Sequence, residues 1–302
     1  MKKTSAIFIM IAATLWGCIG IFVNGLFDQG FTRPQMVFVR TLTAAVGMLI
    51  FMLIFDRKGL KIKPRHIWCF LGTGLFSLYF FNICYFYSMQ YNDSLGVAAV
   101  LLYTAPAFVT VLSCILFKEK FTLKKALSLV LMSVGCVLVS GIINTSTPFS
   151  PVGILFGLGS GIGYALYSIF GRYAINRGYR SSTISFYTFL FALIGSSISG
   201  QPIKTAKMMF TSFETVFLSL GLGIICCVLP YIFYTKGLER TESSTASILA
   251  TAEPMVASVI GIAFFNDRAD LTVLSGIAVM IAGIIIMNIN RKDKDNEKNS
   301  AS

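Results

Sequence analysis

The sequence has few charged residues and almost no histidine. Of its 302 residues, 13% are charged and a single one, His66, is histidine, whereas soluble domains carry about 25% charged residues. No stretch of the chain is both polar and long enough to form a separate ligand-binding domain. These absences argue against a receptor, and against catalysis by clustered histidines or carboxylates. We therefore predict that the chain is not an enzyme.

Signals for metals, cofactors and nucleic acids are missing too. The seven cysteines lie almost entirely in apolar segments, without the spacing of metal ligands. The glycine-rich run Gly157–Gly163 also lies in an apolar segment, so we interpret it as close helix packing and not as a phosphate loop. The net charge of +12 comes from short basic clusters between apolar runs, which set membrane topology. We expect no metal, no cofactor, no use of ATP within this chain and no nucleic-acid partner.

What the sequence has in abundance is apolar runs. The chain is 55% hydrophobic with a mean hydropathy of +0.76, and about 20 apolar residues suffice to cross a bilayer as a helix. We predict an all-α integral membrane protein with ten transmembrane helices and a disordered cytoplasmic tail at 291–302. The expected spans are residues 5–27, 34–55, 67–90, 94–117, 123–142, 152–172, 182–200, 214–235, 243–265 and 271–290.

Lysine and arginine are distributed unequally between the two sides that these spans define. Twenty fall on the side of both termini and four on the other, with Arg40 inside a span. Cytoplasmic loops are enriched in these residues. We therefore expect both termini in the cytoplasm and a location in the plasma or inner membrane.

The chain repeats itself after 148 residues. This shift places Pro106 on Pro254, Trp16 on Tyr164 and Glu119 on Asp267 without a gap. Each half then holds five spans, so the second half must run through the membrane in the inverted sense. We predict a first repeat at 1–147 and a second at 148–290. Inverted repeats are typical of secondary transporters, whose substrate site lies between the halves near the midplane.

These motifs, in this order, resemble those of the EamA-type ten-span exporters of the drug/metabolite transporter superfamily. The resemblance covers about residues 5–290, with two departures: Tyr164 stands where the family often has tryptophan, and Asn266-Asp267 where it usually has Gly-Glu. It implies a ten-span transporter but does not specify the cargo. The matching motifs are Leu15-Trp16-Gly17, Arg33-Pro34 with Val39-Arg40, Pro106 with Phe117-Lys118-Glu119, and Ala252-Glu253-Pro254 with Phe265-Asn266-Asp267.

Glu253 and Arg40 are the two charges that lie deep within expected spans. A charge at such depth costs about 2.5–3.5 kcal/mol on insertion scales, which makes each a candidate for function. Glu253 could face the cavity and bind a proton or a cationic group, or hold its helix by a hydrogen bond. Arg40 could bind a substrate carboxylate, pair with Glu253 or snorkel outward. Pro106 and Pro254, at matching positions, are candidate hinges or plain packing kinks.

Polar and aromatic side chains at similar depth could line the substrate path. Such rings can stack on a substrate or hold an ammonium group. Tyr85, Tyr87 and Tyr91, by contrast, are expected to form an aromatic belt at the membrane boundary. The candidates beside Glu253 and Arg40 are Trp16, Tyr79, Asn82, Tyr103 and Tyr164.

The sequence therefore predicts a secondary transporter that exports a small polar metabolite, such as an amino acid, by alternating access. Proton coupling through Glu253 and facilitated diffusion both remain open. The alternatives are a lipid or nucleotide-sugar carrier of the same fold and, outside transport, a membrane-embedded receptor or enzyme. The partners are a small-molecule substrate and the lipid bilayer; the oligomeric state is left open.

Overall fold

The computed structural model describes residues 3–144, 150–265, 267 and 269–288, and nearly all of them are helical. Within these residues, nine helical stretches are long and apolar enough to cross a membrane. Another helix, α8, has 17 residues and packs along α16. The predicted all-α membrane architecture is confirmed, and α8 coincides with the fifth of the ten expected spans, 123–142. The expected tail at 291–302 and the expected repeat boundary at 147 lie outside the described residues.

The first half contains five spans, three of which change helical geometry along their length. Residue 18 separates α1 from α2, a wide π-helical segment (η3) lies between α4 and α5, and a turn separates α6 from α7. Its elements are α1 (Lys3–Gly17), α2 (Ile19–Asp28), α3 (Arg33–Phe55), η1 (Arg57–Leu60), η2 (Pro64–His66), α4 (Ile67–Leu71), η3 (Gly72–Tyr79), α5 (Phe80–Asn92), α6 (Leu95–Leu102), α7 (Ala105–Phe117), α8 (Leu123–Val139) and η4 (Ile142–Asn144).

The second half repeats this plan with small changes. A π-helical segment again interrupts its third span, at a position that overlaps η3 after the 148-residue shift. The short helix α11 is an addition that the sequence analysis did not predict. Its elements are α9 (Pro151–Ile175), α10 (Ser181–Ser199), α11 (Pro202–Met209), α12 (Phe213–Gly223), η5 (Ile224–Val228), α13 (Leu229–Leu238), α14 (Ser243–Ala250), α15 (Glu253–Phe264) and α16 (Leu271–Asn288).

The first helices of the two halves run in opposite directions. The backbone of Ser5, near the start of α1, lies against Gly237 near the end of α13. Arg172, near the end of α9, binds the Thr241 carbonyl and donates a 3.1 Å hydrogen bond to the Ser243 hydroxyl just beyond α13. The start of α1 and the end of α9 therefore share one end of the bundle, as an inverted repeat requires. We call this the basic end, because the α7–α8 turn carries Lys118 and Lys120 there and the α13–α14 turn carries Arg240.

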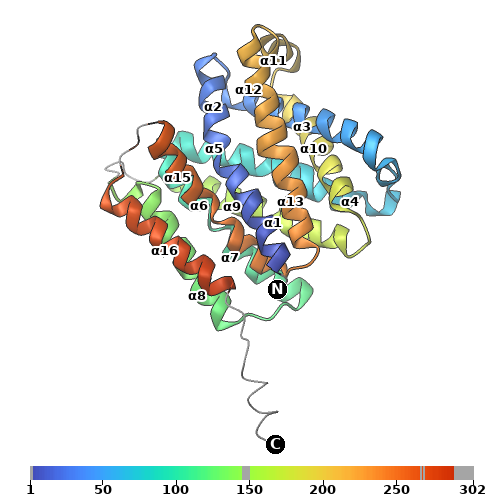
Figure 1. The fold of residues 1–302 in the computed structure, drawn as a ribbon. Coiled ribbons are helices and arrows are strands. Elements are labelled where there is room, and N and C mark those ends of the chain that lie inside the picture. The colour runs from blue at the N-terminus through green and yellow to red at the C-terminus, as the bar shows by residue number, and fades with distance from the viewer. Residues whose placement is uncertain (1–2, 145–149, 266, 268, 289–302) are drawn as a thin grey trace, which may run out of the picture.

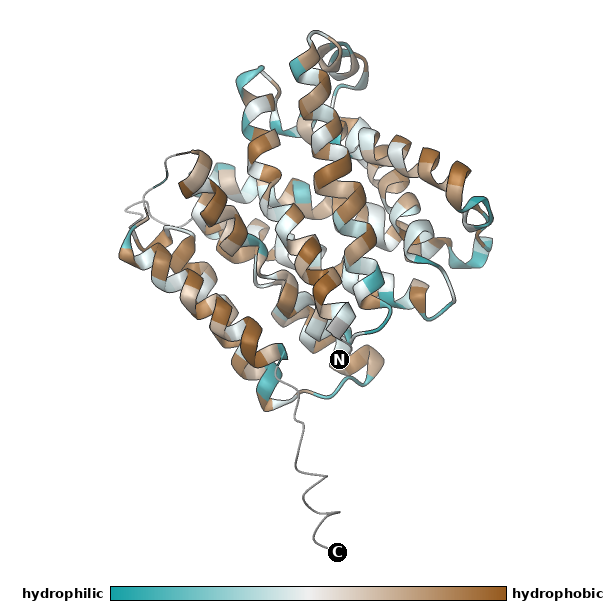
Figure 2. Ribbon diagram, in the orientation of Figure 1, coloured by the Kyte–Doolittle hydropathy of each residue, from teal (hydrophilic) through white to brown (hydrophobic). Residues whose placement is uncertain are grey.

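The two halves are interleaved and not merely side by side. Helix α1 packs on α13, α14 and α15 of the second half, while α9 packs on α5, α6 and α7 of the first (Figure 1). Apolar residues cover the outward faces of the long helices, and hydrophilic residues gather at the turns (Figure 2). This arrangement leaves the lipid-facing surface apolar and brings the broken spans to the centre.

Glycines allow the closest helix contacts. A side chain at Gly161 would lie 2.5 Å from the Thr104 hydroxyl, so the expectation of close packing along α9 is confirmed. The last spans of the two halves meet in the same way, since a side chain at Gly135 of α8 would lie 2.2 Å from Met280 of α16. Small residues at such crossings let backbones approach and gain dispersion contacts.

Gly135→Val should therefore lower the stability of the α8–α16 pair. Overpacking of this kind costs about 1–3 kcal/mol, and thermal unfolding in detergent should show a lower melting temperature. Val134→Leu is the matched control, because Val134 is 46% exposed on the outer face of α8. Equal melting temperatures for the two variants would contradict the close crossing.

Candidate functional site

The fourth and ninth spans both break at their prolines. Helix α6 ends at Leu102 and α7 begins at Ala105, with Pro106 in its first turn. Helix α14 ends at Ala250 and α15 begins at Glu253, with Pro254 next to it. Proline is tolerated in a first turn because its missing N–H would be unpaired there anyway. The breaks are structural facts, while movement about them as hinges stays a prediction.

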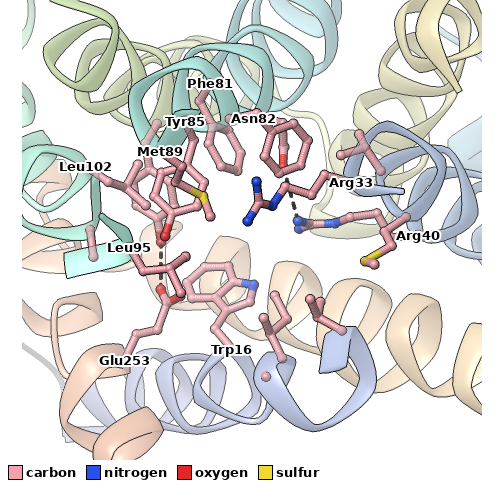
Figure 3. A pocket seen from close by; sticks show the side chains of 18 of the residues that line it. Trp16, Arg33, Arg40, Phe81, Asn82, Tyr85, Met89, Leu95, Leu102 and Glu253 are labelled. Carbon is pink, nitrogen blue, oxygen red and sulfur yellow. Dashed lines mark hydrogen bonds between the residues drawn. The ribbon is translucent and has the colours of Figure 1, made fainter. Parts of the chain in front are cut away.

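A cavity of about 260 Å³ lies beside these breaks (Figure 3). Six of the seven residues proposed for the substrate path line it, each from a different span: Trp16, Arg40, Asn82, Tyr103, Tyr164 and Glu253. The seventh, Tyr79, packs its ring against Gly195 of α10 instead. The structure therefore brings most of the proposed residues together around one cavity.

Glu253 is the first residue of α15, where the positive end of a helix favours a carboxylate. The Tyr164 hydroxyl donates a hydrogen bond to its Oε2 at 3.3 Å. No lysine or arginine among the described residues forms an ion pair with it. Part of the charge of Glu253 is therefore available to a group inside the cavity.

Arg40 faces the same cavity from α3, on the opposite wall from Glu253 (Figure 3). Its Nη1 donates to Asn82 Oδ1 at 3.5 Å, and its buried Nε has no hydrogen-bond partner in the described part of the chain. Asn82 is held in turn by its Nδ2, which donates to the Leu78 carbonyl at 2.6 Å. The proposed pairing of Arg40 with Glu253 does not occur within ion-pair distance in this structure.

Aromatic rings form the floor of the cavity. Trp16 and Tyr164, which coincide in the repeat, meet edge to face with centroids 6.4 Å apart. Tyr231 lies 5.4 Å from Trp16, and Phe81 lies 5.5 Å from Tyr164. These rings close the cavity on the side toward the basic end and offer faces for stacking or for an ammonium group.

Sequence reasoning missed two polar residues of the cavity wall. The sequence analysis uses Arg33 as a topology signal and as part of a family motif but not as a cavity residue, yet its guanidinium points toward the same region as that of Arg40 (Figure 3). Tyr85 was expected in the aromatic belt but lines the cavity, whereas Tyr87 is 43% exposed. Helical spacing could have found both, because positions 33 and 40, or 82 and 85, share one helix face.

The described residues contain no cluster of three histidine, cysteine or acidic side chains that could hold a metal. The chemistry of the cavity therefore comes from two guanidiniums, one carboxylate, one amide and several rings. Such a set can bind and orient a small polar molecule. It does not supply the paired acids or activated nucleophile that most hydrolytic mechanisms use.

The sequence model of the EamA-like transporter family matches residues 3–141 and 151–289. The chain belongs to this family. EamA-like proteins form part of the drug/metabolite transporter superfamily, so the resemblance seen in the sequence motifs is confirmed. The chain is therefore a multi-pass membrane protein of a transporter family.

Relatives and a solved structure agree with this assignment. An uncharacterized transporter of Archaeoglobus fulgidus is 26% identical over 92% of this chain and 94% of its own length. The uncharacterized transporter YxxF of Bacillus subtilis is also 26% identical, over 98% of this chain and 93% of its own. A crystal structure at 15% identity covers 95% of this chain and 97% of its own with a TM-score of 0.77, which shows the same fold.

The unpaired guanidinium of Arg40 leads to a prediction about stability. Asn82→Asp should place a carboxylate beside it and raise the melting temperature by a few degrees, because a gain of about 1 kcal/mol shifts unfolding by about 2–4 °C in chains of 150–250 residues. Asn82→Ser, which removes the acceptor without adding charge, should lower it. A lower melting temperature for Asn82→Asp would contradict the assignment of Arg40 as a buried cation without a counter-ion.

Proposed function

We propose that the protein is a secondary transporter that exports a small zwitterionic metabolite of the amino-acid class by alternating access. The observation that carries this proposal is the placement of unpaired charges of opposite sign across one cavity. The cargo's carboxylate binds Arg40, with Arg33 nearer the entrance. Its ammonium group binds Glu253 above the Trp16 ring.

The size of the cavity favours this cargo over the alternatives. About 260 Å³ lies just below the range of about 300–1,000 Å³ that is usual for drug-sized ligands. A nucleotide sugar or a lipid needs far more room. Arg33 adds a second cation to the cavity, which a nucleotide-sugar carrier would also use, so volume and not charge separates these two hypotheses.

Glu253 bears on the energy source of transport, and the distribution of lysine and arginine bears on the orientation in the membrane. Glu253 can exchange a proton or simply hold an ammonium group, so proton coupling and facilitated diffusion are the two forms of this proposal. The basic end faces the cytoplasm by the charge distribution. The protein then lies in the plasma or inner membrane with both termini inside.

Ligand binding can be measured through Trp16 itself. The sequence has two tryptophans, and Trp68→Phe leaves Trp16 as the reporter on the cavity floor. We expect at least one of the twenty common amino acids to change Trp16 fluorescence, and its N-acetyl and α-amide derivatives to have lost that effect. Fluorescence that responds to none of the amino acids, or equally to the blocked forms, would overturn the zwitterion hypothesis.

The two charged poles predict opposite patterns in two variants. A hydrogen bond to a charged group contributes about 1.5–3 kcal/mol, so losing one weakens binding by about 10- to 100-fold. Glu253→Gln should weaken binding of the amino acid by this factor but spare its analogue without the amine. Arg40→Gln should weaken the amino acid equally but spare the analogue without the carboxylate.

Transport by these variants completes the test. Glu253→Gln should strongly slow amino-acid flux in proteoliposomes while membrane expression stays unchanged. Normal flux in both Glu253→Gln and Glu253→Ala would eliminate a role for this carboxylate in coupling or binding.

A further inference from the structure

The two ends of the bundle differ in how the halves meet. At the basic end, all eight residues of α14 are buried. At the opposite end, its repeat mate α6 leaves Leu95 63% exposed, and Leu95, Ala99 and Leu102 line the cavity. Of the neighbouring helix α15, only Gly261 is buried. The bundle is therefore closed between its halves at the basic end and open at the other.

Glu119 connects the two halves at the closed end. Its carboxylate accepts hydrogen bonds from the Ser243 N–H at 2.7 Å, the Ser244 N–H at 3.1 Å and the Ser244 hydroxyl at 2.5 Å. Glu119 belongs to the first half and α14 to the second. Helix α14 has no side-chain cap from its own preceding residue, Glu242. A carboxylate from the other half thus satisfies the first amides of α14, where the helix dipole also favours negative charge.

Lys125 strengthens this contact. It is 4% exposed, and its Nζ lies 2.7 Å from Glu242 and 3.7 Å from Glu119. The ammonium group therefore joins an acid of each half. Lys125 and Glu119 are buried, while Glu242 is half-exposed. Separating the halves would cost Lys125 one of its two acidic neighbours, so the cluster stabilises the closed basic end.

The repeat places an unused copy of this contact at the open end. The 148-residue shift carries Glu119 to Asp267, and Ser243 and Ser244 to Leu95 and Gly96. The turns match in detail, since the Glu119 N–H bonds the Ser113 carbonyl at 3.2 Å and the Asp267 N–H bonds the equivalent Gly261 carbonyl at 3.1 Å. Asp267 itself is exposed.

The target of this second carboxylate is also available. Ser94 caps α6 by accepting from the Val97 N–H at 3.3 Å. Within the described residues, the amides of Leu95 and Gly96 have no hydrogen-bond acceptor. An acid arriving at this helix end would meet two unpaired amides, as Glu119 does at α14.

We propose that Glu119 and Asp267 are alternating locks of the transport cycle. Glu119 on α14 closes the basic end in the state seen here, and Asp267 on the Leu95 and Gly96 amides closes the opposite end in the other state. The proposal rests on the alternating access proposed above. The repeat mate of Lys125 is Val273, so the second lock lacks the buried ammonium group and is the weaker of the two. The resting protein therefore favours the state that is open away from the basic end.

Cysteine labelling from each side of the membrane tests these locks. The seven native cysteines are replaced, Ala99→Cys is introduced on the cavity wall, and a membrane-impermeant maleimide is added to vesicles of either orientation. Glu119→Gln and Glu119→Ala should lower the labelling rate from the opposite side and raise it from the basic-end side, by about 10-fold for the alanine variant. Asp267→Asn should leave labelling from the opposite side unchanged or faster.

Glu239→Gln is the matched control. Glu239 accepts from the Ser181 N–H at 3.2 Å and from the Ser181 hydroxyl at 2.5 Å, so it caps a helix with the same chemistry. Both partners belong to the second half, so this variant should not change the side from which Ala99→Cys is labelled. Melting temperatures confirm that each variant is folded.

The outcomes separate the locks from the cargo. Three results would overturn the locks: labelling unchanged by the Glu119 variants, an equal shift with Glu239→Gln, or a shift in the same direction with Asp267→Asn. In each case, amino-acid flux in the parent protein would still support the proposed function. Labelling that shifts with Glu119→Ala alone supports the locks, even if no amino acid is transported and the proposed cargo is wrong.

Discussion

A charge inside a membrane must be paired or hydrated, and this requirement shapes the centre of the protein. Glu253 and Arg40 each cost about 2.5–3.5 kcal/mol if left in hydrocarbon, yet they form no ion pair with each other. Both instead face one cavity, where Tyr164 donates a hydrogen bond to Glu253 and Arg40 donates one to Asn82. Such a cavity exists because two spans break at their prolines and leave their helices short of full packing there.

The two repeats share the helix breaks and the aromatic rings around the cavity, but not its charged residues. The helix breaks of the fourth and ninth spans coincide after the 148-residue shift, as do the Trp16 and Tyr164 rings that meet on the cavity floor. The charges do not coincide, because the mate of Arg40 is Thr188, which bonds Thr73 within the packed bundle at 2.7 Å. The duplicated halves thus build a cavity between them, and one unmatched charge from each half, Arg40 and Glu253, gives that cavity a positive and a negative wall.

Most of the fold could be predicted from the sequence. Long apolar runs mark the membrane spans, and two prolines at matching positions help to reveal the repeat. Helix α11 could not, because its eight residues are too short and too polar to give that signal. Of the cavity residues, Glu253, Arg40 and Asn82 were predicted because polar groups are costly at depth. Arg33 and Tyr85 were missed because residues near a membrane boundary have ordinary reasons to be there, and Tyr79 was included because depth alone does not tell which way a side chain points.

The way the basic end is closed fits the alternating access proposed above, in which this end would also open. Apolar helix contacts at a membrane boundary would expose their surface to water each time the halves parted. Breaking a contact between a carboxylate and helix amides costs less free energy than exposing apolar surface, because water can hydrate both the carboxylate of Glu119 and the amides of Ser243 and Ser244 once they separate. The net free energy of such a contact is therefore small enough for the contact to break and reform. Its hydrogen bonds are also directional, so that they fix one arrangement of the halves. In the proposed cycle, polar caps at helix ends, more than the apolar core, are thus the contacts that would let the interleaved repeats exchange one closed end for the other.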